Sequence, residues 1–139
     1  RDWINELSIN GLYEKYGIAP GDIQSRISNA DWISYSLARL SALFKPEIRR
    51  ELEILNIRIR EGIKPEVMDL TMISGIGRVR ARRLFNAGIK SIAEVAASDE
   101  ARIMRIYGFS HALASSIIRR AKAIASEEVH SGSKGHGPE

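Results

Sequence analysis

Two closely spaced glycines are the residues of this 139-residue sequence whose spacing best suits ligand binding. Gly75 and Gly77 flank Ile76, and a predicted helix follows directly. Glycines let the backbone turn tightly and approach a ligand, and the first turn of a helix presents unpaired N–H groups. A phosphate can be held there without any base being read. The same pair is also common as a plain turn between helices, so spacing alone leaves both interpretations open.

Arginines crowd the first turns of that predicted helix: Arg78, Arg80, Arg82 and Arg83. The helix dipole disfavours cations at this end, so the cluster indicates an anionic partner. The structural alternative is a set of surface ion pairs with Glu66, Asp69 or Glu94. The net charge supports an anionic partner for this segment. Residues 64–125 hold eleven Lys and Arg against five Asp and Glu, whereas residues 1–63 hold nine of each.

Trp32 is a second candidate for binding nucleic acid. At 100° per residue it lies on the polar side of a predicted long helix, together with Ser25, Ser28, Ser36 and Arg39. A large aromatic residue there either packs against a neighbouring helix, such as the one that contains Trp3, or stacks on a base. In the second case, Arg39 would contact a phosphate or add a cation–π contact.

The sequence gives little support for an enzyme. It contains no cysteine, and its histidines (His111, His130 and His136) are scattered. It has no Gly-x-x-x-x-Gly-Lys-Ser/Thr loop for ATP and no metal-ligand spacing, so no catalytic residue, cofactor or metal is expected in this chain. No apolar run approaches membrane-span length and no signal peptide is present, so a cytoplasmic protein without membrane contact is expected. A monomer is also expected, although no sequence feature determines the oligomeric state.

The apolar pattern predicts an all-α fold, because strand-like alternation is absent. A long helix is expected from Ile23 to Phe44, after a break and cap at Pro20-Gly21-Asp22. Its apolar residues recur at three- and four-residue steps, which predicts a single buried face. These residues are Ile23, Ile27, Ala30, Ile33, Leu37, Leu40 and Phe44. Pro46 and Gly62 are expected to bound the next helix, and the first domain to end at residue 63.

Residues 64–125 fall into two similar units, each with a helix, a glycine-containing hairpin and a second helix. Ile76 is expected to anchor the first hairpin on the core. The second hairpin, Tyr107–Ser110, keeps only Gly108 and is expected to be mainly structural. The last helix is expected to end at about Ala125, and residues 126–139 are predicted to form a disordered tail because they lack an apolar period.

The stretch from Ile73 to Ile89, with its Gly-Arg-Val-Arg-Ala-Arg run, resembles the end of archaeal DNA helicases of the Hjm (Holliday-junction migration) family. These are superfamily-two motors related to the helicase part of DNA polymerase theta. The similarity extends upstream through Tyr16, Pro20-Gly21-Asp22, Ala30-Asp31-Trp32 and the stretch from Arg58 to Lys64. It covers nearly the whole chain except the tail.

The resemblance implies a parent enzyme that uses ATP and Mg²⁺ to unwind DNA 3′ to 5′ at stalled or branched replication forks. Residues 1–63 would be the C-terminal part of its helical ratchet domain, a helical bundle in which an aromatic side chain stacks on the single strand. Trp32 matches that aromatic position. The family's basic residue falls at Ser25 in this sequence, so Arg26 or Arg39 is expected to replace it.

Residues 64–125 would be the terminal tandem helix-hairpin-helix domain. The resemblance implies that this domain grips the emerging strand and restrains the motor, with Arg80 and Arg82 at the junction.

The leading hypothesis is therefore an accessory region that binds single-stranded or forked DNA and contacts the motor domains of its own parent chain. Its expected DNA-binding residues are Trp32, Arg26, Arg39, Gly75, Ile76, Gly77, Arg78, Arg80, Arg82 and Arg83. The alternative is a protein-interaction module whose arginines dock on the motor or on a replication or repair protein. A free-standing DNA-binding protein is disfavoured by the family resemblance and by a sequence that begins at Arg1.

Overall fold

The computed structural model describes residues 1–132, with side chains up to residue 127, and this described part is helical and contains no strand. The predicted all-α fold is confirmed. The chain divides into two compact units, Arg1–Met68 and Asp69–Glu139. No helix within the described range is long and apolar enough to cross a membrane.

The first unit contains the short helix η1 (Trp3–Asn5), then α1 (Ile9–Tyr16), α2 (Pro20–Phe44), η2 (Pro46–Ile48), α3 (Arg49–Glu61) and η3 (Pro65–Val67). Local signals set several of these bounds. The Ser8 hydroxyl accepts the Gly11 N–H at 3.0 Å, and Gly17 ends α1 with a φ of +65°. The long helix begins at Pro20, because proline suits the first helical position. Asp22 therefore lies in the first turn of α2, as an acidic residue near the positive end of the helix dipole, and does not cap the helix.

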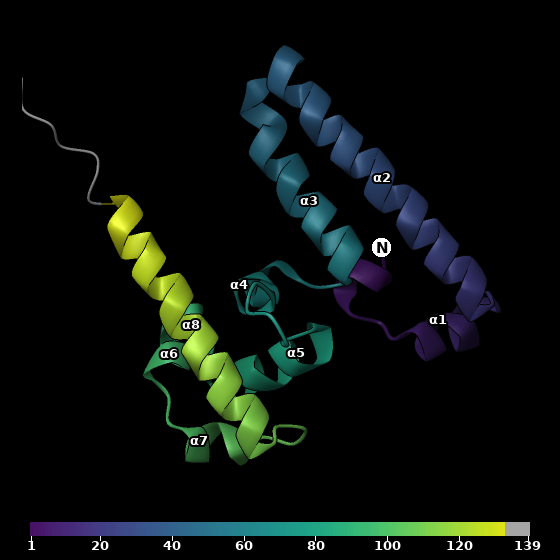
Figure 1. Ribbon diagram of the computed structural model, residues 1–139. Coiled ribbons are helices and arrows are strands. Elements are labelled where there is room, and N and C mark those ends of the chain that lie inside the picture. Colours follow the sequence, from purple (N-terminus) through teal and green to yellow (C-terminus); the bar gives the residue numbers. More distant parts are fainter. Residues whose placement is uncertain (133–139) are drawn as a thin grey trace, which may run out of the picture. The chain divides into compact units, whose positions relative to one another are not determined.

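The long helix α2 packs side by side with α3 (Figure 1). The prediction of one buried apolar face on α2 is only half correct. Ile23 and Ile27 are buried, but Ile33, Leu37, Leu40 and Phe44 are exposed. The buried residues in this half are Ser34, Ala38 and Ser41, whose small side chains let α3 approach closely. This small-residue row lies about 100° around the helix from the apolar row, because each residue advances by that angle.

The second unit contains α4 (Met68–Thr71, whose first residue belongs to the first unit), α5 (Arg78–Asn86), α6 (Ile92–Ala97), α7 (Glu100–Met104) and α8 (His111–Gly132). Helix α8 packs along α6 and α7 (Figure 1). The core of this unit is apolar, and its fully buried large side chains are Leu70, Ile73, Leu84, Ile89, Val95, Ile103 and Ile117. The second unit thus has a continuous core of its own.

Two elements of the second unit differ from the sequence prediction. Helix α6 was not predicted; it forms because the Ser91 hydroxyl accepts the Glu94 N–H at 3.1 Å and caps it. Helix α8 continues to Gly132, so the predicted end at about Ala125 is wrong. No proline or glycine interrupts the chain between those residues, and Glu127 and Glu128 are good helix formers. Residues 133–139, the rest of the predicted disordered tail, lie outside the described residues.

Candidate nucleic-acid interface

The first hairpin is a tight turn that only glycine suits. Gly75 has a φ of +96°, in the left-handed region, and the Ile76 N–H donates to the Ile73 carbonyl at 3.0 Å. Ile76 is buried, as predicted, and anchors the turn on the core. Gly77 occupies the position directly before α5 and has no side chain that could cap the helix. It therefore leaves the N–H groups of the first turn of α5 without a side-chain cap.

The second hairpin repeats this geometry. Gly108 has a φ of +90°, and the Phe109 N–H donates to the Ile106 carbonyl at 3.3 Å. Phe109 is buried in the place that Ile76 takes in the first hairpin. Ser110 precedes α8 and accepts the Leu113 N–H at 3.3 Å. The two hairpins are therefore equivalent turns, with Ser74 and Tyr107 in matching positions.

Two arginines connect these hairpins crosswise. Arg120 of α8 donates to the Ser74 carbonyl of the first hairpin at 2.6 Å. Arg83 of α5 donates to the Tyr107 carbonyl of the second hairpin at 3.1 Å. Each arginine thus binds the matching carbonyl of the hairpin that belongs to the other helix pair. The position of each hairpin is fixed by a charged hydrogen bond from outside it.

The hairpins border one common hollow of about 350 Å³, lined by Gly77, Arg78, Val79, Arg80, Arg83 and Gly108. Its lining includes the first turn of α5 and three of the four arginines of this helix that were predicted to bind DNA. Arg80 is exposed and donates to the Gly75 carbonyl at 3.2 Å, which holds its charge beside the hairpin. Backbone N–H groups and guanidinium groups that converge in this way suit an anion such as a phosphate.

Arg82 lies apart from this hollow. Its guanidinium lies over the Phe85 ring, 5.1 Å from the ring centre, and Lys90 lies 5.2 Å from the same centre. The carboxylates considered as ion-pair partners also bind backbone N–H groups. Asp69 accepts the Ile92 N–H at 2.9 Å, and Glu94 accepts the Lys90 N–H at 2.7 Å.

Trp32 projects from α2 with 71% of its surface exposed. The alternative prediction, that Trp32 packs against the helix of Trp3, is wrong, because most of the Trp32 side chain is exposed. The Trp3 indole N–H instead donates to the Ile59 carbonyl of α3 at 2.7 Å. Tyr35 is exposed one turn further along α2, so two aromatic side chains are accessible on this helix. An exposed indole ring is suited to base stacking.

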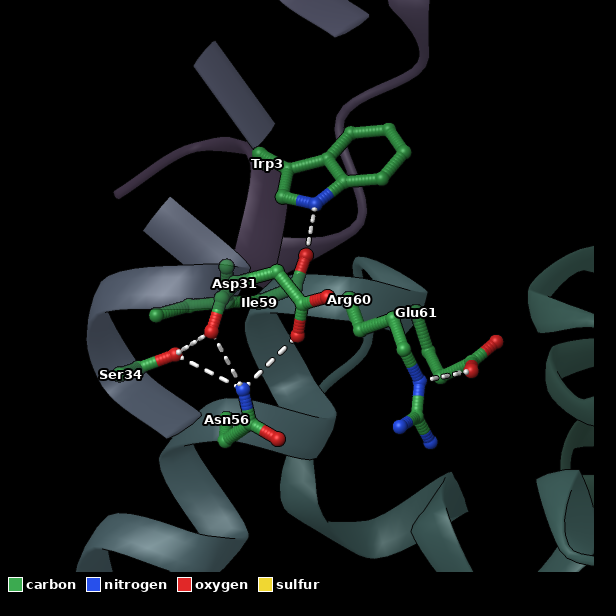
Figure 2. A network of polar contacts seen from close by, with 7 residues as sticks. All are labelled: Trp3, Asp31, Ser34, Asn56, Ile59, Arg60 and Glu61. Atoms are coloured by element: carbon green, nitrogen blue, oxygen red, sulfur yellow. Dashed lines mark hydrogen bonds and ion pairs between the residues drawn. The ribbon is translucent and has the colours of Figure 1, made fainter. Parts of the chain in front are cut away.

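A buried amide supports the turn that carries Trp32 (Figure 2). Asn56 of α3 donates through Nδ2 to the Asp31 carbonyl at 2.9 Å and to Asp31 Oδ1 at 2.8 Å. The same Nδ2 lies 2.9 Å from the Ser34 Oγ, which itself donates to the Asp31 carbonyl. Sequence reasoning missed Asn56; a lone polar residue among the apolar positions of α3 was the available signal.

The two basic residues considered beside Trp32 lie on different sides of α2. Arg39 follows Trp32 by seven residues, two turns of helix, and therefore shares its face. Arg26 instead lines an apolar groove of about 520 Å³ with Trp3, Ile23 and Ile27. The hydroxyl of Ser25 donates to the Gly21 carbonyl at 3.1 Å. Arg39 is thus the basic side chain best placed to act with Trp32.

The described residues provide no group of three or more His, Asp or Glu side chains that could hold a metal ion. The sequence also lacks a nucleotide-binding loop of the Gly-Lys-Ser/Thr type.

Comparison with known proteins agrees with this two-part organisation. The family described as archaeal helicase, domain 4, matches residues 1–62, and the family of SAM-like helix-hairpin-helix tandems matches residues 67–123. The first part of the chain thus matches a domain of archaeal helicases, and the second part matches a helix-hairpin-helix tandem.

Individual relatives specify the family further. The chain is 63% identical to the ATP-dependent DNA helicase Hel308 of Thermoplasma acidophilum and 60% identical to that of Thermoplasma volcanium, over 93% of its length in each case. It is 36% identical to the Hel308 helicase of Thermococcus kodakarensis over 85% of its length. It spans only 19% of each Thermoplasma relative and 11% of the third. Over most of its length this chain therefore matches the domain 4 and helix-hairpin-helix region of archaeal Hel308 helicases.

Proposed function

We propose that this chain is the DNA-gripping accessory region of an ATP-dependent 3′–5′ DNA helicase that acts at stalled or branched replication forks. Trp32 stacks on a base of the single strand, and the first hairpin with α5 holds phosphates. The region also restrains the motor domains of its parent, and those domains supply the site for ATP and Mg²⁺. The chain alone performs no catalysis.

The observation that carries this proposal is the hollow beside the first hairpin. Gly77, the first turn of α5 and Arg80 converge there, and Arg80 is exposed. Arginines at a helix start cost stability through the dipole unless an anion is present. A DNA phosphate supplies that charge and accepts hydrogen bonds from both the guanidinium and the backbone.

The experiment that tests the proposal measures binding of fluorescent single-stranded, duplex and forked DNA over a range of salt concentrations. Arg80→Ala should weaken binding and lower the slope of log affinity against log salt by about 0.7 on single strands, because one phosphate contact is lost. Arg102→Ala is the matched control, since Arg102 is an exposed arginine of α7 that does not line the hollow. Equal affinities and slopes for both variants and the unchanged chain would contradict the proposal.

One observation favours the alternative, a module that docks on the motor domains. Ile33, Leu37, Leu40 and Phe44 form an exposed apolar row on α2, and Phe44 is 79% exposed. Contiguous exposed apolar surface commonly marks an interface. The relatives are about five times longer than this chain, so their remaining domains offer a partner for this row.

Leu40→Glu separates the two functions. In the isolated chain this exposed side chain should be replaceable without loss of fold or of DNA affinity. In the full-length parent, a docking role predicts lower thermal stability and altered ATP hydrolysis. If Arg80→Ala loses DNA binding and Leu40→Glu has no effect in the parent, only the DNA-gripping function is supported and the docking function is contradicted.

A further inference from the structure

We propose that the second hairpin carries a base-stacking site, in which the Tyr107 ring, held by Arg83, stacks on an unpaired nucleobase. The inference rests on the proposed function, because it requires a DNA strand at the hairpins. It assigns a binding role to a hairpin that the sequence predicted to be mainly structural.

Tyr107 is unusually accessible for a large aromatic residue. Its surface is 83% exposed, more than that of Trp32, although Tyr107 belongs to the second unit, which has an apolar core of its own. The matching residue of the first hairpin is Ser74, a small polar residue that a hairpin tip tolerates easily. Folding of the turn therefore does not require an aromatic side chain, and its presence at Tyr107 calls for a contact outside the unit.

The ring is accessible yet held in place. Arg83 Cζ lies 4.8 Å from the ring centre, a cation–π distance, and Arg83 also donates to the Tyr107 carbonyl at 3.1 Å. The adjoining turn is fixed by Gly108 and by the buried Phe109. One guanidinium thus binds both the backbone and the ring of Tyr107. A ring held in this way loses little side-chain entropy when a ligand stacks on it.

The remaining face of the ring is suited to a nucleobase. Arg83 covers one face, and an exposure of 83% leaves the opposite face open to a ligand. Stacking on aromatic rings is tolerant of base identity, because each base has a π face. Paired bases in a duplex are stacked on one another and do not offer that face. The ligand class is therefore an unpaired base of single-stranded DNA.

The phosphate hollow lies next to this ring. Gly108, which follows Tyr107 directly, and Arg83, which lies against its ring, both line the hollow with Gly77 and Arg80. A strand whose phosphate occupies the hollow brings a neighbouring base within reach of the second hairpin. The two equivalent turns then have different roles: the first holds the backbone and the second stacks a base.

The test compares two strands of equal length, an ordinary oligothymidylate and a fully abasic strand, against the complete 139-residue chain. Tyr107→Ala should weaken binding to the ordinary strand about 5- to 150-fold and leave binding to the abasic strand unchanged. Tyr107→Phe keeps the ring and should retain the affinity of the original chain. Circular dichroism of each variant establishes that the helices persist.

The possible outcomes are distinct. Equal losses on both strands would show that Tyr107 acts only through the shape of the hairpin, and no loss on either strand would show that it does not touch DNA; each result overturns the inference while the proposed function stands. If the unchanged chain fails to bind the ordinary strand, the proposed function fails and this inference fails with it.

Discussion

The side-chain amide of Asn56 on α3 binds two oxygen atoms of Asp31 on α2, the backbone carbonyl at 2.9 Å and Oδ1 at 2.8 Å. Figure 2 shows this contact between Asn56 and Asp31. Asp31 directly precedes Trp32, so the contact fixes the turn from which the Trp32 indole ring projects. Asn56 is buried while Trp32 is exposed. The helix pair therefore combines a rigid inner side with an accessible aromatic residue on its outer side.

Asn56→Ala should lower the free energy of unfolding of the first unit by about 1–3 kcal/mol, because it removes buried hydrogen bonds and leaves a small cavity. Both tryptophans, Trp3 and Trp32, belong to this unit. Urea unfolding followed by tryptophan fluorescence therefore reports this unit alone. Asn29→Ala, at an exposed position of α2, is the control and should change the free energy by no more than about 0.5 kcal/mol. Equal effects of the two substitutions would show that the Asn56 contacts add nothing.

Sequence signals that act over a few residues predicted the structure well. Gly62 ends α3 as expected, and Ile76 is buried and anchors its hairpin as expected. These outcomes depend on hydrogen bonds and backbone angles that neighbouring residues determine.

Features that depend on distant partners were not predictable in the same way. Periodicity correctly placed Leu37 and Leu40 on one face, but it does not say what covers that face, and in this chain both are exposed. The bonds of Arg83 and Arg120 to the hairpins join residues 24 and 46 positions apart. A helical pattern alone shows only that such arginines avoid the core.

The stability of the first unit should depend on the ionisation of Asp2. The Lys15 ammonium donates to its carboxylate at 2.6 Å and the Tyr16 hydroxyl at 2.7 Å, and these bonds lower the pKa of Asp2 below its usual value of 3.8. The ionised form therefore stabilises the folded state above that pH, and the contribution disappears as the pH falls through the lowered pKa. The urea midpoint of the original chain should exceed that of Asp2→Asn at neutral pH, and the difference should shrink in acid. A constant difference would contradict this linkage.

Trp32→Ala should weaken single-strand binding about 5- to 150-fold through the loss of base stacking. It should leave the fold unchanged, as judged by circular dichroism, because the side chain is exposed. Phe44→Ala is a matched control, since Phe44 is an exposed aromatic residue on another face of the same helix. Equal affinity losses for both variants in an anisotropy titration would mean that α2 binds DNA without a specific stacking residue.

Arg39 and Arg26 should differ in their effect on DNA binding, although both are exposed arginines of α2. Arg39→Ala should lower the slope of log affinity against log salt by about 0.7, because Arg39 shares the face of Trp32. Arg26→Ala should leave the slope unchanged, since Arg26 lines the apolar groove on another side. Salt titrations of the two variants in parallel compare these slopes. A lower slope for Arg26→Ala and an unchanged slope for Arg39→Ala would assign the phosphate contact to Arg26.

Substitutions of the two glycines of the first hairpin should have different effects, one on the stability of the second unit and the other on DNA binding. Gly75→Ala should destabilise the second unit by about 1–3 kcal/mol, because φ is +96° and the new Cβ would lie 3.0 Å from Arg120 Nη1. Gly77→Ala should have little effect on stability, since φ is −86° and no atom lies within 4 Å of the new Cβ. Gly77 lines the hollow proposed to hold a phosphate, so the added methyl group should take up space there and weaken DNA binding. Thermal unfolding followed by circular dichroism and anisotropy titrations measure the two effects. If Gly77→Ala binds DNA as tightly as the original chain, the phosphate does not lie against this glycine.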